Sequence, residues 1–141
     1  MTILIALLLA AANTTTPTGA PIVWPAKDVI WTDAAAVKGA KLSVLWGDPK
    51  KEASGTFKKF PAGTEIPPHT HSSDLRTIVV AGTLSFRVGE APAQELGPGS
   101  YAFVPSGVVH GTTCGAESEC VVYEEQPGPA DFLPQKGEAK R

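Results

Sequence analysis

The chain is organised around the stretch GTEIPPHTH at residues 63–71 and its partner GSYAFVPSGVVH at residues 99–110. Together they contain every histidine of the protein, His69, His71 and His110. Side chains alternate between the two faces of a β-strand, so His69 and His71 are predicted to point the same way. A third imidazole from a neighbouring strand would complete a chelating set, because neutral imidazole is a common ligand of divalent transition metals. The pattern therefore predicts a metal site.

The spacing of glycine, proline and histidine in both stretches resembles the two sequence motifs of the cupin superfamily. The matching residues are Gly63, His69, His71, Arg76 and Gly82 for the first motif, and Gly99, Pro105, Gly107, His110 and Cys114 for the second. The resemblance implies an all-β fold, the antiparallel cupin barrel also called a double-stranded β-helix or jelly roll. It also implies a homodimer, and a divalent Fe, Zn, Mn, Ni or Cu ion held by His69, His71 and His110.

The chain departs from the cupin pattern at two positions. The acidic ligand of the family falls at Arg76, whose guanidinium cannot bind a cation. We expect Arg76 either to face outward and pair with Asp74 or a nearby glutamate, or to bind an anionic group of a substrate. The asparagine of the second motif falls at Cys114. Tyr101 is a further candidate for substrate binding, the alternative being a core tyrosine, and Glu65 is a candidate carboxylate if its loop folds back.

Short runs of β-branched and aromatic residues, separated by glycine and proline turns at roughly 8–12-residue intervals, favour a β-sandwich or barrel. The predicted strands cover residues 40–46, 55–60, 76–80, 84–88, 94–96, 101–104, 108–114 and 120–124. Tyr101 and Phe103 share one strand face, as do Ile78 and Val80, and one of these two pairs is expected to line the interior. The lysines at 58–59 are predicted to be solvated.

Length and charge limit the classes of function. The chain has 141 residues, which suits one domain, and 43% of them are hydrophobic, enough to form a core. The 14 glycines and 13 prolines suit a fold with many turns. The net charge of −2 gives no reason to expect nucleic acid or an acidic membrane surface as a partner.

The N-terminal region differs from the rest of the chain. Residues 3–12 are an unbroken apolar run, shorter than the roughly 20 residues that cross a bilayer but suited to the apolar part of a secretory signal. We therefore predict a signal peptide and flexible lead-in over residues 1–20, a cupin barrel over 21–128 and a flexible tail over 129–141. Export to the periplasm or the extracellular space follows. The alternative is a buried N-terminal segment.

The two cysteines are consistent with export. Cys114 and Cys120 flank residues 115–119, which we interpret as a hairpin loop. Opposed hairpin residues lie about 4.5–5.5 Å apart, within disulfide range. An oxidising compartment would give a disulfide, whereas the cytosol would leave free thiols. Cys114 as a metal ligand remains a third interpretation.

The resemblance leaves two classes of function open. One is a metal-dependent enzyme acting on a small molecule, either a dioxygenase-like oxidoreductase or an isomerase or lyase that polarises a carbonyl compound. The other is a non-enzymatic module that binds or senses a metal or a small ligand. The sequence has no Gly-x-Ser-x-Gly nucleophile motif and no phosphate-binding glycine loop.

Overall fold

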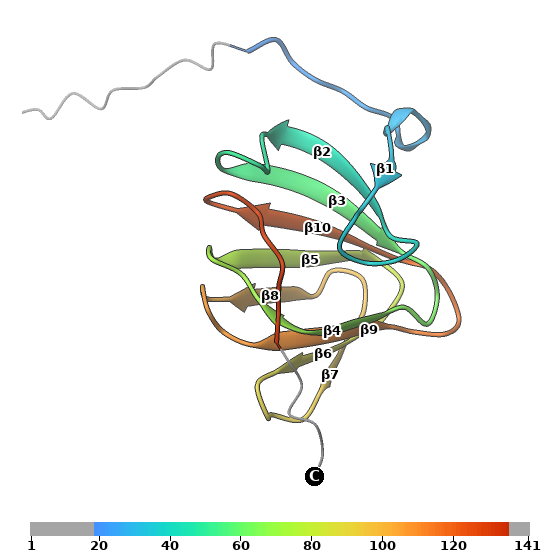
Figure 1. Cartoon of the computed structure of the whole chain (residues 1–141). Helices are drawn as coiled ribbons and strands as arrows, with labels where there is room; N and C mark the ends of the chain where they lie inside the picture. Colours follow the sequence, from blue (N-terminus) through green and yellow to red (C-terminus); the bar gives the residue numbers. More distant parts are fainter. Residues whose placement is uncertain (1–18, 136–141) are drawn as a thin grey trace, which may run out of the picture.

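The computed structural model describes residues 19–135, and β-strands dominate this part of the chain (Figure 1). The strands are β1 (Thr32–Asp33), β2 (Lys41–Gly47), β3 (Ser54–Phe60), β4 (Glu65–Thr70), β5 (Leu75–Ala81), β6 (Leu84–Val88), β7 (Gln94–Leu96), β8 (Tyr101–Val104), β9 (His110–Cys114), β10 (Cys120–Gln126) and β11 (Leu133–Pro134). A short 3-10 helix, η1 (Ala26–Asp28), precedes them. Within residues 19–135 no helix has the length and hydrophobicity that a membrane crossing requires. The predicted signal segment lies almost wholly outside the described residues.

The strands form two antiparallel sheets. The six-stranded sheet has the order β1-β2-β3-β10-β5-β8, and the five-stranded sheet has the order β11-β4-β9-β6-β7. From β3 to β6, and again from β8 to β10, successive strands alternate between the two sheets. This alternation, visible in Figure 1, is the connectivity of a jelly roll. The predicted all-β, antiparallel jelly-roll fold is confirmed.

The core lies between the sheets because alternate residues of each strand point inward. Its largest cluster consists of Ala40, Phe60, Ile66, Val79, Leu84, Cys114, Cys120 and Val122, and a smaller one of Leu75, Phe86 and Val104. Strand β5 shows the rule directly: Leu75, Thr77 and Val79 are buried, whereas Ile78 and Val80 are exposed.

The expectation that Ile78 and Val80, or Tyr101 and Phe103, line the interior is wrong for both pairs. All four side chains lie on the outside of the six-stranded sheet, with exposed fractions of 42%, 47%, 58% and 46% respectively. Ile78 pairs with Tyr101 across β5 and β8, so the four form one continuous surface, here called the outer patch. The interior positions of these strands are taken by their sequence neighbours, such as Val79.

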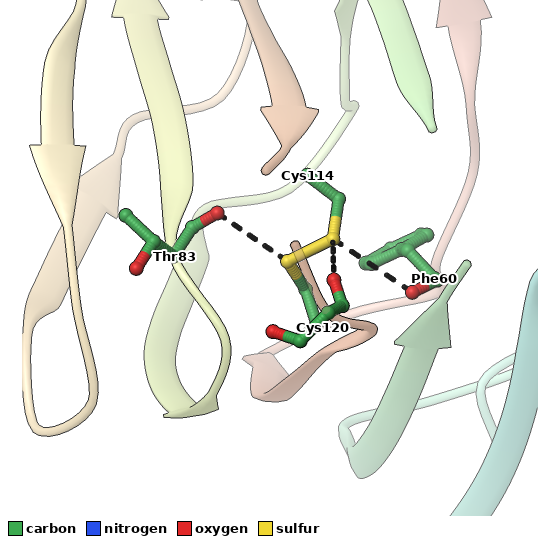
Figure 2. The surroundings of a disulfide bond; sticks show 5 residues. Phe60, Thr83, Cys114 and Cys120 are labelled. Carbon is green, nitrogen blue, oxygen red and sulfur yellow. Dashed lines mark hydrogen bonds between the residues drawn. A yellow bond between two sulfur atoms is a disulfide. The ribbon is translucent and has the colours of Figure 1, made fainter. Parts of the chain in front are cut away.

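Cys114 and Cys120 form a disulfide, which Figure 2 shows in its surroundings. Both residues are fully buried, and the Cys120 sulfur lies 3.4 Å from the carbonyl oxygen of Thr83. The bond was expected from a hairpin, but that geometry is wrong. Cys114 ends β9 in the five-stranded sheet and Cys120 begins β10 in the six-stranded sheet, so the disulfide links the two sheets.

The predicted flexible tail begins too early, because residues 129–135 pack against the barrel. Strand β11 pairs with the end of β4, placing Leu133 opposite Thr70. Asp131 accepts hydrogen bonds from the backbone N–H of Ser72, at 2.9 Å, and from the Ser72 hydroxyl. The proline and lysine content of this end suggested a loose tail, but the segment packs against the first histidine motif. Residues 136–141 of the predicted tail lie outside the described part.

Candidate metal centre

The three histidines meet on the inner face of the five-stranded sheet. His69 lies in β4 and His110 begins β9, and the two are direct cross-strand partners. His71 follows the end of β4 with the same strand parity as His69. All three side chains are buried, and one ligand atom from each lies within 4.8 Å of the other two. The structure therefore brings together the residues that the sequence predicts as metal ligands.

Backbone contacts join the two histidine motifs. Pro67 and Pro68 have no N–H to donate, and the β4–β9 register shifts between Ile66 and His69. The N–H of Gly107, whose φ of +76° favours glycine, donates to the carbonyl of His71 at 2.9 Å. The glycine and proline spacing of the motifs thus has a structural cause: it holds one histidine strand against the other.

Each imidazole is oriented by a hydrogen bond from its Nδ1 to a backbone carbonyl. His69 Nδ1 lies 2.8 Å from the oxygen of Pro67, and His110 Nδ1 lies 3.1 Å from that of Val108. His71 Nδ1 lies 2.5 Å from the oxygen of Asp131. A carbonyl can only accept, so each Nδ1 must carry the proton. This tautomer leaves the Nε2 lone pair of all three rings free, as in metal-ligating histidines whose other ring nitrogen donates to a backbone carbonyl.

Burial favours the neutral form of the His69 and His110 imidazoles. Desolvation lowers the pKa of His69 to about 4, outweighing the hydrogen bond to Pro67 that acts to raise it. Desolvation also lowers the pKa of His110. A neutral imidazole is the form that binds a metal, so neither of these two rings has to release a proton at neutral pH to bind one.

The same pKa shifts predict a pH dependence of the metal-free protein. Between the ordinary histidine pKa near 6.5 and the lowered value of about 4 for His69, the unfolded chain binds a proton that the folded chain excludes. The free energy of unfolding should therefore fall as pH falls through this window, by up to about 1.4 kcal/mol per pH unit for each such imidazole. Urea unfolding of chelator-treated protein between pH 7.5 and 4.5 measures this decrease. The change in unfolding free energy per pH unit should be smaller in a His69→Ala variant.

A cavity of about 330 Å³ lies between the sheets, with the imidazoles on one wall. Phe132 stacks on the ring of His69, with centroids 4.2 Å apart. The opposite wall carries side chains of the six-stranded sheet: Leu42, Thr56, Lys58, Leu75, Thr77, Val122, Glu124 and Gln126. This volume suits a small molecule with both apolar and polar groups.

The other predicted site residues lie away from the cavity. Arg76 faces outward, with its guanidinium 5.2 Å from the centroid of Phe103, and Leu75 takes the inward position on the cavity wall opposite the imidazoles. In the described part of the chain Arg76 makes no ion pair, with Asp74 or any other carboxylate. Tyr101 belongs to the outer patch, and Glu65 is exposed at the start of β4. Cys114 is bonded to Cys120, so its sulfur is not a free ligand.

Sequence reasoning missed four cavity residues. Lys58 was predicted to be solvated, but it lies on the inner face of β3 and pairs with Glu124. Its parity with the buried Thr56 and Phe60 was the available signal. Asp131 and Phe132 come from the supposed tail, and no local sequence feature marks them.

The residues present suit a divalent transition metal. Three neutral imidazoles supply three nitrogen ligands and leave coordination positions for water or a substrate, which is the catalytic pattern and not the closed structural one. The cluster contains no carboxylate among its grouped ligand atoms. Iron, zinc, manganese, nickel and copper all accept such a set, so the geometry does not choose among them.

Comparison with known families matches residues 21–140 to the family described as "Domain of unknown function (DUF4437)". The chain belongs to this family. Solved structures of cupin proteins share the fold of this chain. A search of curated proteins found no significant match.

Three solved structures illustrate the likeness. The polyketide cyclase RemF from Streptomyces resistomycificus has 19% identity and a TM-score of 0.71 over 85% of this chain and 89% of that one. An RmlC-like cupin from Shewanella frigidimarina has 21% identity and a TM-score of 0.61 over 84% and 95%. The DMSP lyase DddQ from Ruegeria pomeroyi has 20% identity and a TM-score of 0.65 over 79% and 64%. At these identities the likeness establishes the cupin fold.

Proposed function

We propose that this DUF4437 cupin is a divalent-metal-dependent enzyme that acts on a small molecule in the cavity between its sheets. The observation that carries the proposal is the hydrogen-bonding of the imidazoles. All three Nδ1 atoms are bonded to backbone carbonyls, so His69, His71 and His110 each keep a free Nε2 in a buried cluster. Such rings need no rearrangement of their tautomers to receive an ion.

A divalent ion bound there would polarise an oxygen of the substrate as a Lewis acid. The protein's own contribution is to fix the three rings, to shield them from solvent and to shape the space in front of them. Phe132 covers one ring, while Asp131 holds His71 through its backbone carbonyl. Exclusion of water by these groups strengthens every electrostatic interaction with a bound substrate.

Between the two enzyme classes we favour isomerisation or elimination of a carbonyl compound over oxygenation. The favouring observation is the charged pair Lys58–Glu124, which lines the same cavity and gives it a group able to accept a proton. Two of the solved relatives are called a cyclase and a lyase, which is compatible with this choice.

Metal analysis and an activity panel together test this function. The purified protein should contain about one divalent ion per chain by mass spectrometry, and should convert a carbonyl compound at the same rate with and without oxygen. Consumption of oxygen in step with turnover would instead identify an oxygenase. Full metal occupancy with no turnover across diketones, hydroxyketones and keto acids would favour the non-enzymatic binding or sensing module.

We also propose that the protein is exported to the periplasm or secreted. The apolar run at residues 3–12 supports this, as does a buried disulfide that an oxidising compartment would maintain. The mass of the mature protein recovered outside the cytoplasm tests it, because cleavage within the predicted signal segment must shorten the chain. Recovery of the full-length chain from the cytosol would contradict export.

Finally, we propose a homodimer built on the outer patch. One face of an antiparallel sheet is usually solvated and polar, whereas here Ile78, Val80, Tyr101 and Phe103 form a continuous exposed apolar surface. The patch carries complementary charges at its edge. Arg76 and Glu125 are cross-strand neighbours, so a two-fold axis through the patch can pair the arginine of each copy with the glutamate of the other. A second copy of the chain is therefore the occupant that fits.

A further inference from the structure

The cavity has a charged pair on the wall that faces the histidines. Lys58 comes from β3 and Glu124 from β10, both in the six-stranded sheet, whereas His69 and His110 come from the five-stranded one. Lys58 Nζ lies 2.5 Å from Glu124 Oε2. The side chain of Glu124 is 12% exposed and that of Lys58 is 27% exposed, so the pair is largely withdrawn from solvent.

Within the described residues, the ionic partner of Glu124 is Lys58. Its carboxylate is not among the atoms grouped with the imidazoles, so it is not placed as a fourth ligand. Its Oε2 is shielded from solvent, and within the described chain the Lys58 ammonium is the group that contacts it. The other carboxylate lining the cavity, Asp131, is already held by both donor groups of Ser72. Glu124 is therefore the cavity carboxylate that remains available to a bound molecule.

A pair in this position costs the fold stability. Removing two charges from water is unfavourable, and well-packed apolar residues of similar volume are often at least as stable. The strand positions of Lys58 and Glu124 are otherwise core positions, since Phe60 and Val122 share their faces.

We propose that Glu124 is the proton-transferring residue of this cavity and that Lys58 positions it and binds an oxygen of the substrate. This proposal rests on the function proposed above and deepens it. In the step, the Glu124 carboxylate accepts a proton from the carbon next to a substrate carbonyl. The C–H electron pair forms a C=C bond, and the carbonyl oxygen takes up the negative charge.

The step is completed when protonated Glu124 returns the proton to another atom of the same molecule, either a carbon or a leaving group. Nothing is oxidised or reduced, and both side chains end in their starting states. The ammonium of Lys58 donates to one substrate oxygen while Glu124 accepts from the adjacent carbon or hydroxyl. A small carbonyl compound that carries a hydroxyl or a second carbonyl group would fit this arrangement of a donor next to an acceptor. A cavity of about 330 Å³ can hold such a molecule.

Exchange of carbon-bound hydrogen for deuterium tests the proposal without knowledge of the final product. Zinc-loaded protein is incubated in D₂O with dihydroxyacetone, acetoin or pyruvate, and loss of the α-proton signal is followed by NMR. The wild type should accelerate exchange of at least one probe over protein-free zinc. Glu124→Gln should slow it by at least about 100-fold, the usual contribution of a general base, with zinc content unchanged. Lys58→Met should raise KM more than it lowers kcat.

Glu95→Gln is the matched control, because it removes the same charge from an exposed position on β7 and should exchange at the wild-type rate. If Glu124→Gln fails to fold, the neutral pair Lys58→Met/Glu124→Gln replaces it. Full zinc occupancy with undiminished exchange in the Glu124 variants overturns the proposal, as does absence of exchange with all three probes. In both cases the metal centre stands, whereas absence of bound zinc in the wild type overturns the proposed function itself.

Discussion

Replacing His69 and His71 together by alanine is expected to abolish tight metal binding. The two rings supply two of the three nitrogen ligands, and His110 alone leaves an ion mainly coordinated by water. Loss of an outer-shell partner already costs 10–100-fold in metal affinity, so loss of two ligands should lower the affinity by more than about 100-fold. Titration of the metal-free proteins with Zn²⁺ against a competing chelator measures the difference.

Thr70→Val is the control for this experiment. Thr70 lies between the two histidines in sequence but has the opposite strand parity, so its replacement keeps all three imidazoles. The control should bind zinc like the wild type, and circular dichroism should show that every variant keeps its β-structure. Equal zinc affinity in the double alanine variant and the wild type would show that His69 and His71 do not bind the metal.

If the proposed homodimer forms on the outer patch, a charge placed there is expected to separate its two copies. Ile78 and Tyr101 are cross-strand partners near the centre of the patch, so Ile78→Lys/Tyr101→Lys puts two ammonium groups from each copy into one apolar contact. Like charges juxtaposed across an interface cost several kcal/mol, which corresponds to more than about a 100-fold weaker association. Sedimentation velocity across a concentration series should find the wild type as a dimer and the variant as a monomer.

Val88→Lys serves as the comparison. Val88 is also exposed, at 40%, but it belongs to β6 in the five-stranded sheet, outside the outer patch. The Val88→Lys protein should remain a dimer. A wild-type protein that sediments as a monomer at every concentration would refute the dimer, and a doubly substituted protein that still dimerises would place the interface on another face.

The sequence predicts the fold and the histidine cluster because both depend on local rules. Alternation along a strand puts His69 and His71 on one face whatever the rest of the chain does. Glycine and proline positions report backbone constraints, such as the positive φ of Gly107, that leave few alternatives. Both sequence patterns are informative because moving a histidine or a glycine by one position along the chain would change the strand face or the backbone conformation that it requires.

The errors arise where two faces of a strand look alike or where a contact is remote in sequence. Strand β5 is apolar on both faces, so its pattern did not reveal that Ile78 and Val80 point outward. Lys58 was taken for a surface residue because lysine usually is one, and its partner Glu124 lies far along the chain. Likewise, the short separation of Cys114 and Cys120 suggested a hairpin, although the chain changes sheets between them.

The position of a bound metal ion is the direct test of the three-histidine centre. Crystals of the protein loaded with Zn²⁺ can be measured on both sides of the zinc absorption edge, and the anomalous difference map locates the ion. We predict one strong peak, about 2.0–2.1 Å from the Nε2 atoms of His69, His71 and His110, with Nδ1 of each ring still bonded to its carbonyl. Three imidazoles that turn away from one another, with zinc bound elsewhere or not at all, would contradict it.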